Sequence, residues 1–236
     1  MTTRMSKHLL RREAAARAAR VRVLVVAGGV VLVAASVWAL FFSSWFRVDD
    51  VQVRGESVLS AEEVLAAAAI RSGTPLIRLD SDGVTNRVAA LPPVDVVSVT
   101  RQWPHTVVIT VVERQPALSV PSDQGFAIYD HEGVAYVEVI APPDGVPRLA
   151  TDDPDDLAVQ SVLDVLAELP GPLLSRLATV RAETPDAIEL ELADGIVVVW
   201  GSAEQSPRKA EVLTALMKQP ARVYIVSAPD APAIRQ

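Results

Sequence analysis

The sequence predicts an α+β protein with an apolar segment near its N-terminus, and three observations lead to this prediction. Residues 23–42 contain no charged side chain over 20 positions. After them, segments with apolar residues at every second position occur together with segments of helical periodicity. The helical segments lie between pairs of strands joined by short turns, which is typical of α+β domains.

The apolar segment, "VLVVAGGVVLVAASVWALFF", is long enough as a helix to cross the roughly 30 Å hydrocarbon core of a bilayer. Aromatic residues crowd its C-terminal end, and residues 1–22 carry seven basic side chains and one acidic side chain. This bias places the N-terminus in the cytoplasm. A cleaved signal peptide would have a shorter apolar region followed by small residues. We therefore expect a basic cytoplasmic tail (1–22) and an uncleaved transmembrane helix (23–42).

The rest of the chain is acidic and lacks cysteine. The net charge is −7, and the residues after Arg22 hold 15 basic and 28 acidic side chains. This balance argues against nucleic acid as a partner, because phosphate backbones select clustered Lys and Arg. The absence of cysteine excludes disulfides, a thiolate zinc site and a cysteine nucleophile.

Residues 46–115 predict the order strand, helix, helix, strand, strand. The first strand is Val48–Arg54. Ser60 and Glu63 match a capping box before the first helix, and Asp80 is placed to cap a second helix over Ser81–Ala90. A hairpin of β-branched residues over 97–112 completes the unit.

A second unit follows a boundary that we place near Gln115–Ala117. Its predicted elements are a strand pair around 130–133, a helix from about Pro154, a hairpin over 188–200 with a turn at Asp194 and Gly195, a helix over 204–219 and a closing strand over 223–227.

Candidate catalytic and ligand-binding residues are few. The three histidines, His8, His105 and His131, belong to no recognisable catalytic motif. The acidic cluster at 152–156 lacks the pattern of a calcium loop and suits a helix N-terminus instead. Trp103 and Trp200 lie in strand patterns, which favours packing over ligand stacking. We expect no enzymatic activity, no cofactor and no metal site.

The motifs "FRVDDVQVRG", "SAEEVLAAAAI", "GTPLIRLD" and "VTRQWPHTVVITVVERQPAL", in this order after an anchor, resemble a POTRA domain. With the β-rich region that follows, the whole chain resembles the bacterial FtsQ/DivIB cell-division family. The resemblance implies a POTRA domain (46–115), an FtsQ-type β domain (116–228) with a mixed sheet and flanking helices, and a Pro/Ala-rich tail (229–236). It also implies a non-catalytic single-pass scaffold of the cell membrane at the division septum, which controls septal peptidoglycan synthesis.

The closing strand is the predicted interaction site. A strand placed last often lies at a sheet edge, and nothing downstream of Ser227 is expected to cover it, so a partner strand could pair with it. The alternative is a strand that only completes its own sheet. The resemblance names the partners as FtsB/DivIC-like and FtsL-like proteins, with other division proteins on the POTRA domain. By position it implies contacts through the closing strand and its flanks, Arg222, Val223, Tyr224, Ile225, Val226 and Ser227, with the tail 228–235 and the outer face of the 204–219 helix.

Two other functions stay open at this stage. One is a POTRA-containing component of polypeptide export or outer-membrane assembly, although such proteins normally carry several POTRA domains and this chain has one. The other is a membrane-anchored cell-wall enzyme, which the missing catalytic motifs disfavour.

Overall fold

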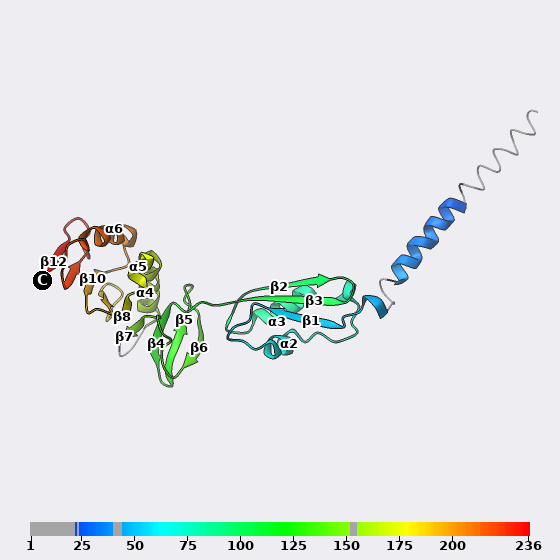
Figure 1. The fold of residues 1–236 in the computed structure, drawn as a ribbon, viewed down its shortest axis with the longest axis horizontal. Helices are drawn as coiled ribbons and strands as arrows, with labels where there is room; N and C mark the ends of the chain where they lie inside the picture. Colours follow the sequence, from blue (N-terminus) through cyan, green and yellow to red (C-terminus); the bar gives the residue numbers. More distant parts are fainter. Residues whose placement is uncertain (1–21, 23, 40–43, 152–154) are drawn as a thin grey trace, which may run out of the picture. The chain divides into compact units, whose positions relative to one another are not determined.

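The computed structural model describes residues 22, 24–39, 44–151 and 155–236 (Figure 1). Residues 24–39 are helical. Among the described residues, no helix combines the length and the apolar character needed to cross a membrane. Residues 1–21 of the expected cytoplasmic tail, positions 23 and 40–42 of the expected anchor, and Asp152 and Asp153 lie outside the described residues.

The chain divides into two compact units. One consists of the residues up to Val88 together with Val97–Val111, and the other of Ala89–Val96 together with Val112–Gln236.

The first unit is built around a three-stranded sheet with the order β1-β3-β2. Its strands are β1 (Asp50–Arg54), β2 (Val94–Gln102) and β3 (Thr106–Glu113), and its helices are α2 (Ala61–Ala68) and α3 (Ser81–Ala89), with short 3₁₀ turns η1 (Ser44–Phe46) and η2 (Leu76–Arg78). β1 pairs with β3 in parallel, with Asp50 opposite Thr106. The expected order of elements is confirmed, and β1 begins two residues later than predicted.

Both helices of the first unit start at the caps that the sequence predicts. The backbone N of Glu63 donates to Ser60 Oγ at 3.2 Å, and the backbone N of Ser60 donates to Glu63 Oε2 at 2.9 Å. For α3, the backbone N of Gly83 donates to Asp80 Oδ1 at 3.0 Å. Each cap satisfies backbone N–H groups that have no partner inside the helix, which fixes where the helix begins.

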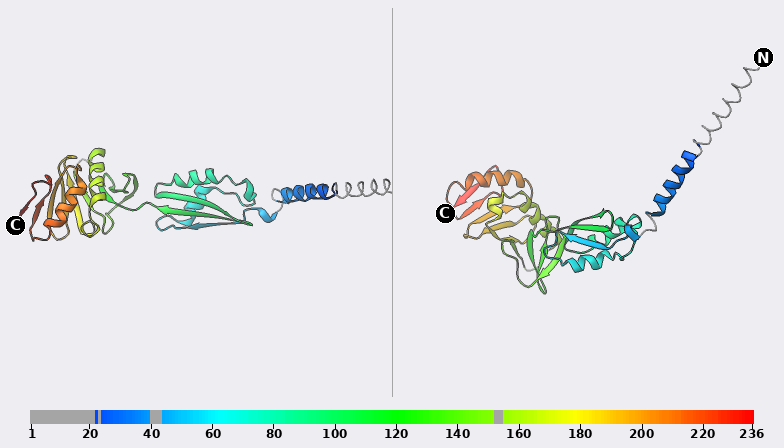
Figure 2. Two further views of the ribbon diagram at one scale, coloured as in Figure 1. Left: turned by 90° about the horizontal axis from the view of Figure 1, so that it is seen from above. Right: turned by 45° about the vertical axis from the view of Figure 1, so that its right-hand side comes forward.

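The second unit contains a nine-stranded mixed sheet with the order β12-β11-β10-β9-β8-β7-β4-β5-β6. The two ends of this order, β12–β11 in red and β4–β6 in green, lie far apart in the views of Figures 1 and 2. The strands are β4 (Leu118–Ser122), β5 (Gly125–Tyr129), β6 (Ala135–Val139), β7 (Arg148–Ala150), β8 (Leu177–Ala182), β9 (Ile188–Leu192), β10 (Val197–Gly201), β11 (Val223–Ile225) and β12 (Ala233–Arg235), and the helices are α4 (Asp156–Glu168), α5 (Gly171–Leu174) and α6 (Ser206–Leu216).

The core of the second unit lies between α4, α6 and the central strands. Trp200 of β10 is fully buried and donates from Nε1 to Ser206 Oγ at 3.1 Å, which links the sheet to the start of α6. The helix predicted from about Pro154 is confirmed as α4, and its apolar stripe is buried in this core: Val162, Leu163 and Leu166, with Leu169 at its C-cap. Asp155 caps α4 by accepting a hydrogen bond from the backbone N of Ala158 at 2.6 Å.

Candidate partner-binding surface

Strand β11 lies inside the sheet, between β10 and β12. It pairs with β10 in parallel, with Val223 opposite Val197, and with β12 in antiparallel, with Val223 also opposite Arg235. The expectation that the strand over 223–227 offers a free edge is therefore wrong. The strand is also shorter than predicted and ends at Ile225.

The chain returns to β11 because the connection after it forms a turn. The backbone N of Ala231 donates to the carbonyl of Ala228 at 2.9 Å. Pro229 and Pro232 lie in this connection, where the missing N–H groups interrupt no ladder. The expectation that nothing downstream of Ser227 covers the strand is therefore wrong, because the chain turns through this connection and pairs again as β12.

At this end of the sheet the edge strand is therefore β12, while β6 lies at the opposite end. Backbone groups of alternate residues in a strand point towards opposite neighbours. The carbonyl of Arg222 accepts from Val197 N at 2.9 Å, and Val226 N donates to Val199 O at 3.0 Å, so the ladder to β10 uses even-numbered positions of β11 and its flanks. At the start of the strand, Arg222 N instead donates to Arg235 O of β12 at 3.0 Å. With Val223 opposite Arg235, the same alternation directs the N–H and C=O of Ile234 away from β11. The centre of β12 thus presents one donor and one acceptor outward.

Buried side chains hold this edge in place. Tyr224 is 2% exposed, its hydroxyl donates to Gln219 O at 2.7 Å, and the same oxygen accepts from Ala221 N at 3.2 Å. Val226 is fully buried, and Ile234 packs against the same core. The edge is therefore supported by packing and by a bond to the chain that follows α6.

Charged side chains lie at both ends of the β11–β12 pair: two exposed arginines at one end, and an ion pair at the connection between the strands. Arg222 and Arg235 are exposed and lie next to each other, since Arg222 N donates to Arg235 O at 3.0 Å. In the connection between β11 and β12, the carboxylate of Asp230 pairs with Arg208 of α6. The exposed arginines favour an acidic segment as the partner.

Lys209 of α6 lies under the connection and borders a cavity of about 260 Å³. It is 2% exposed, and its Nζ donates to Ser202 O at 2.9 Å. Burial lowers the pKa of Lys209, and the nearby carboxylate of Glu204 opposes this shift in part. This lysine supports the loop after β10 and is not accessible to a partner.

The structure separates the six predicted contact residues into two groups. Arg222 and Ser227 are exposed, and Val223 and Ile225 are half-buried. The side chains of Tyr224 and Val226 are buried and belong to the core, so they can support an interface but cannot contact a partner. Sequence reasoning missed Ala233, Ile234 and Arg235 as a strand, because three residues after a proline carry too little periodicity to indicate one.

The described residues hold no cluster of three or more His, Asp or Glu side chains that could bind a metal ion. His105 and His131 are exposed in turns. The fold and this surface define a class of protein: a βααββ unit followed by a larger α+β unit whose nine-stranded sheet ends in a supported strand edge.

Comparisons with known proteins agree with this class. The family described as "POTRA domain, FtsQ-type" matches residues 46–114, and "Cell division protein FtsQ/DivIB, C-terminal" matches residues 120–228. The chain is 40% identical over 222 residues to a cell division protein FtsQ of Streptomyces venezuelae, covering 89% of this chain and 82% of the relative. It is 37% identical to the protein of that name from Streptomyces coelicolor, covering 89% of this chain and 86% of the relative.

A third relative, the FtsQ of Mycolicibacterium smegmatis, is 37% identical and aligns with 92% of this chain but 63% of its own length. The solved extracytoplasmic domain of DivIB from Geobacillus stearothermophilus is 22% identical and covers 44% of this chain and 91% of its own, with a TM-score of 0.36. The chain belongs to the FtsQ/DivIB family of bacterial cell-division proteins. Because the family model and the relatives are described as cell-division proteins, the protein has a role in cell division.

Proposed function

We propose that this protein is a membrane-anchored scaffold of the divisome that binds FtsB/DivIC-like and FtsL-like partners by strand addition to β12. The observation that carries this proposal is the outward direction of the Ile234 N–H and C=O at the end of the nine-stranded sheet. Strand addition derives its affinity from such main-chain groups, and nearby side chains give specificity.

In this proposal the β11 residues act mainly through their support of β12. Tyr224 and Val226 hold the edge against the core, while Arg222 and Arg235 contact acidic side chains of the incoming strand. Ser227, the connection over 228–232 and the outer face of α6 form the flank of the interface. The scaffold thereby links early and late division proteins and controls septal peptidoglycan synthesis, with further division proteins on the POTRA domain.

The proposed placement is single-pass in the cell membrane, with the basic N-terminal tail in the cytoplasm. Residues 23–42 form the anchor, and the POTRA domain (46–115) and β domain (116–228) lie outside the membrane, concentrated at the division septum. The uncharged run and the basic cluster before it support this placement. A fluorescent fusion checks it: mid-cell bands are expected, and uniform membrane fluorescence would instead favour the polypeptide-export alternative.

A pair of substitutions at Ile234 tests strand addition. Ile234→Pro removes the outward N–H together with the side chain, whereas Ile234→Ala removes only the side chain beyond Cβ. We expect the full-length proline variant to lose co-purification with the FtsB/DivIC homologue of the same genome and the alanine variant to retain most of it. Thermal unfolding of both variants serves as the folding control. Equal binding by a folded proline variant and the unchanged protein would contradict strand addition at β12.

A further inference from the structure

Three segments of the first unit meet at the end of its sheet where β1 begins. Val48 N donates to Thr74 O and Gly73 N donates to Val48 O, both at 2.9 Å. Asp49 N donates to His105 O at 3.0 Å. The segment after the expected anchor is therefore bonded to both the connector before α3 and the β2–β3 turn. We call the surface formed by residues 44–49, 71–78 and 101–105 the hairpin-tip surface.

Large aromatic side chains lie exposed on the hairpin-tip surface. Trp45 is 79% exposed and Trp103 is 48% exposed. The ring of Phe46 contacts the ring of Trp103 edge to face, with centroids 5.7 Å apart. Indole rings have an apolar body and a polar N–H, so they are enriched at membrane–water interfaces, where the body can lie among apolar groups and the N–H can reach water.

The same three segments carry exposed arginines. Arg47, Arg71 and Arg78 are exposed on the hairpin-tip surface, and Arg101 donates to Leu79 O at 2.7 Å. Asp49, Asp50 and Asp80 lie nearby, and Asp80 is engaged in capping α3. This surface is thus slightly basic in a chain whose residues after Arg22 are strongly acidic overall.

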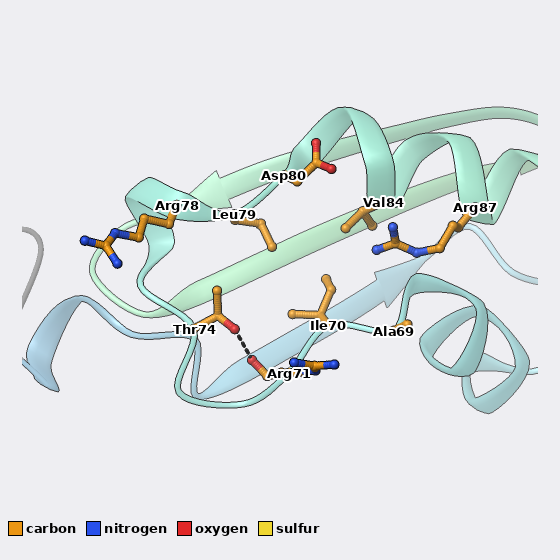
Figure 3. Close-up of a pocket in the computed structure, with 9 residues that line it drawn as sticks. All are labelled: Ala69, Ile70, Arg71, Thr74, Arg78, Leu79, Asp80, Val84 and Arg87. Atoms are coloured by element: carbon orange, nitrogen blue, oxygen red, sulfur yellow. Dashed lines mark hydrogen bonds between the residues drawn. The ribbon is translucent and has the colours of Figure 1, made fainter.

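A cavity of about 460 Å³ extends from this surface between α2 and α3. Figure 3 shows Thr74 and Arg78 at the end where β1 starts, and Arg87 farther along the cavity. Arg87 binds Ala68 O through two nitrogens, at 2.7 and 3.3 Å, and so closes the end of α2. The remaining walls combine Arg71 and Arg78 with apolar side chains, Ile70, Leu79 and Val84.

Chain length keeps this surface close to the expected anchor. Trp45 follows the last residue of the predicted span by three positions, and three residues reach at most about 10 Å. The polar layer on each side of a bilayer is roughly 5–7 Å thick. Trp45 therefore cannot leave the neighbourhood of the headgroups, and Arg47 follows it by two residues.

We propose that the hairpin-tip surface of the POTRA domain rests on the phospholipid headgroups, with Trp45 and Trp103 in the interfacial layer and Arg47, Arg71 and Arg78 on lipid phosphates. Guanidinium groups bind phosphate with paired hydrogen bonds, and indoles favour the same layer. This inference rests on the membrane anchor of the proposed function. It means that the POTRA domain always turns its hairpin-tip surface towards the bilayer.

Fluorescence quenching in lipid nanodiscs tests this contact, and the absence of native cysteine allows single-site labelling of the full chain. A fluorophore is attached at His105→Cys on the hairpin-tip surface or at Arg54→Cys at the other end of β1. We expect a headgroup-spin-labelled phospholipid to quench the label at position 105 several-fold more than the label at 54. Trp103→Ser combined with Arg71→Gln should reduce quenching at 105 towards the level at 54, while the matched control Arg54→Gln should not.

Three outcomes would overturn the inference. Quenching could be equal at positions 105 and 54, or quenching at 105 could be unchanged by Trp103→Ser with Arg71→Gln. The third outcome is quenching at 105 that appears only after a partner protein is added. The last would assign the surface to a protein. A label at Ser36→Cys with an acyl-chain-labelled lipid reports the anchor separately. Loss of quenching there refutes the anchor and the inference together, whereas normal quenching there with none at 105 refutes the inference alone. Thermal unfolding confirms that each variant is folded.

Discussion

Asp130 and Arg114 form the most buried ion pair among the described residues. The carboxylate, with its side chain 6% exposed, pairs with the guanidinium, whose side chain is 16% exposed. It also accepts hydrogen bonds from Glu132 N at 2.9 Å and Val134 N at 2.8 Å. Burial by itself raises the pKa of Asp130, but the bonds from Val134 N, Arg114 and Glu132 N outweigh burial, so this pKa lies below its usual value.

The sign of the resulting pH dependence follows from the direction of this shift. Because the folded pKa of Asp130 is lowered, the carboxylate stabilises the fold fully above the unfolded value of about 4, and this contribution is lost as pH falls below it. We expect Asp130→Asn to destabilise the second unit by about 2 kcal/mol at pH 7 and to cost less at pH 3. Thermal denaturation at both pH values measures the difference.

Asp194→Asn is the matched control, because Asp194 also pairs with an arginine, Arg176, but both side chains are nearly half exposed. Exposed pairs are screened by water, so this substitution should change stability little at pH 7. Equal losses for the two variants would contradict the argument that burial gives the Asp130 pair its effect.

At the scale of elements, α2 depends on a cap that its own sequence supplies. Ser60 and Glu63 satisfy each other's backbone N–H groups, and Ser60 Oγ donates to Glu63 Oε2 at 2.7 Å. We expect Ser60→Ala to cost about 1 kcal/mol and to speed hydrogen exchange in the first turn of α2 about fivefold. Hydrogen exchange followed by mass spectrometry measures this effect.

Glu62→Gln is the control for this cap. Glu62 lies in the same first turn but outside the capping box, so its loss weakens only the favourable charge at the helix N-terminus. Unchanged exchange in Ser60→Ala would show that packing of Val64 and Ala68, both buried, determines where α2 begins.

At the scale of the whole molecule, each unit has buried apolar residues of its own. Ile109 in β3 and Leu190 in β9 are both fully buried, one in each unit. Removing a buried side chain of this size costs about 2–5 kcal/mol, because it loses transfer free energy and leaves a cavity. We expect Leu190→Ala to lower only the unfolding transition of the second unit, and Ile109→Ala only that of the first, in calorimetry of the full chain.

Leu190→Ala and Ile109→Ala each serve as the control for the other, and the variant that carries both substitutions tests whether their losses of stability add. If the units unfold independently, the two losses should add within about 0.5 kcal/mol. A single transition that both substitutions lower equally would show instead that the units unfold as one cooperative body.

Local signals in the sequence were sufficient for much of the fold. The capping residues Ser60 and Asp80, the turn at Asp194 and Gly195, and the stripe of α4 each involve residues within a few positions of one another. Such interactions depend on short-range geometry, so the pattern alone predicts them. β7 has three residues, and β8 mixes polar and apolar side chains, so neither had a clear signal of its own.

The sequence by itself determined the two α+β units and their family, because local periodicity, helix caps and the order of elements indicate them. The uncharged 20-residue segment can likewise be read directly from the sequence. Only the tertiary structure decided which strand ends the sheet. Pairing of Val223 with both Val197 and Arg235 depends on chain segments that meet only after folding, and a three-residue strand is stable only when its neighbour is already in place. For that reason β12, and not β11, presents the edge.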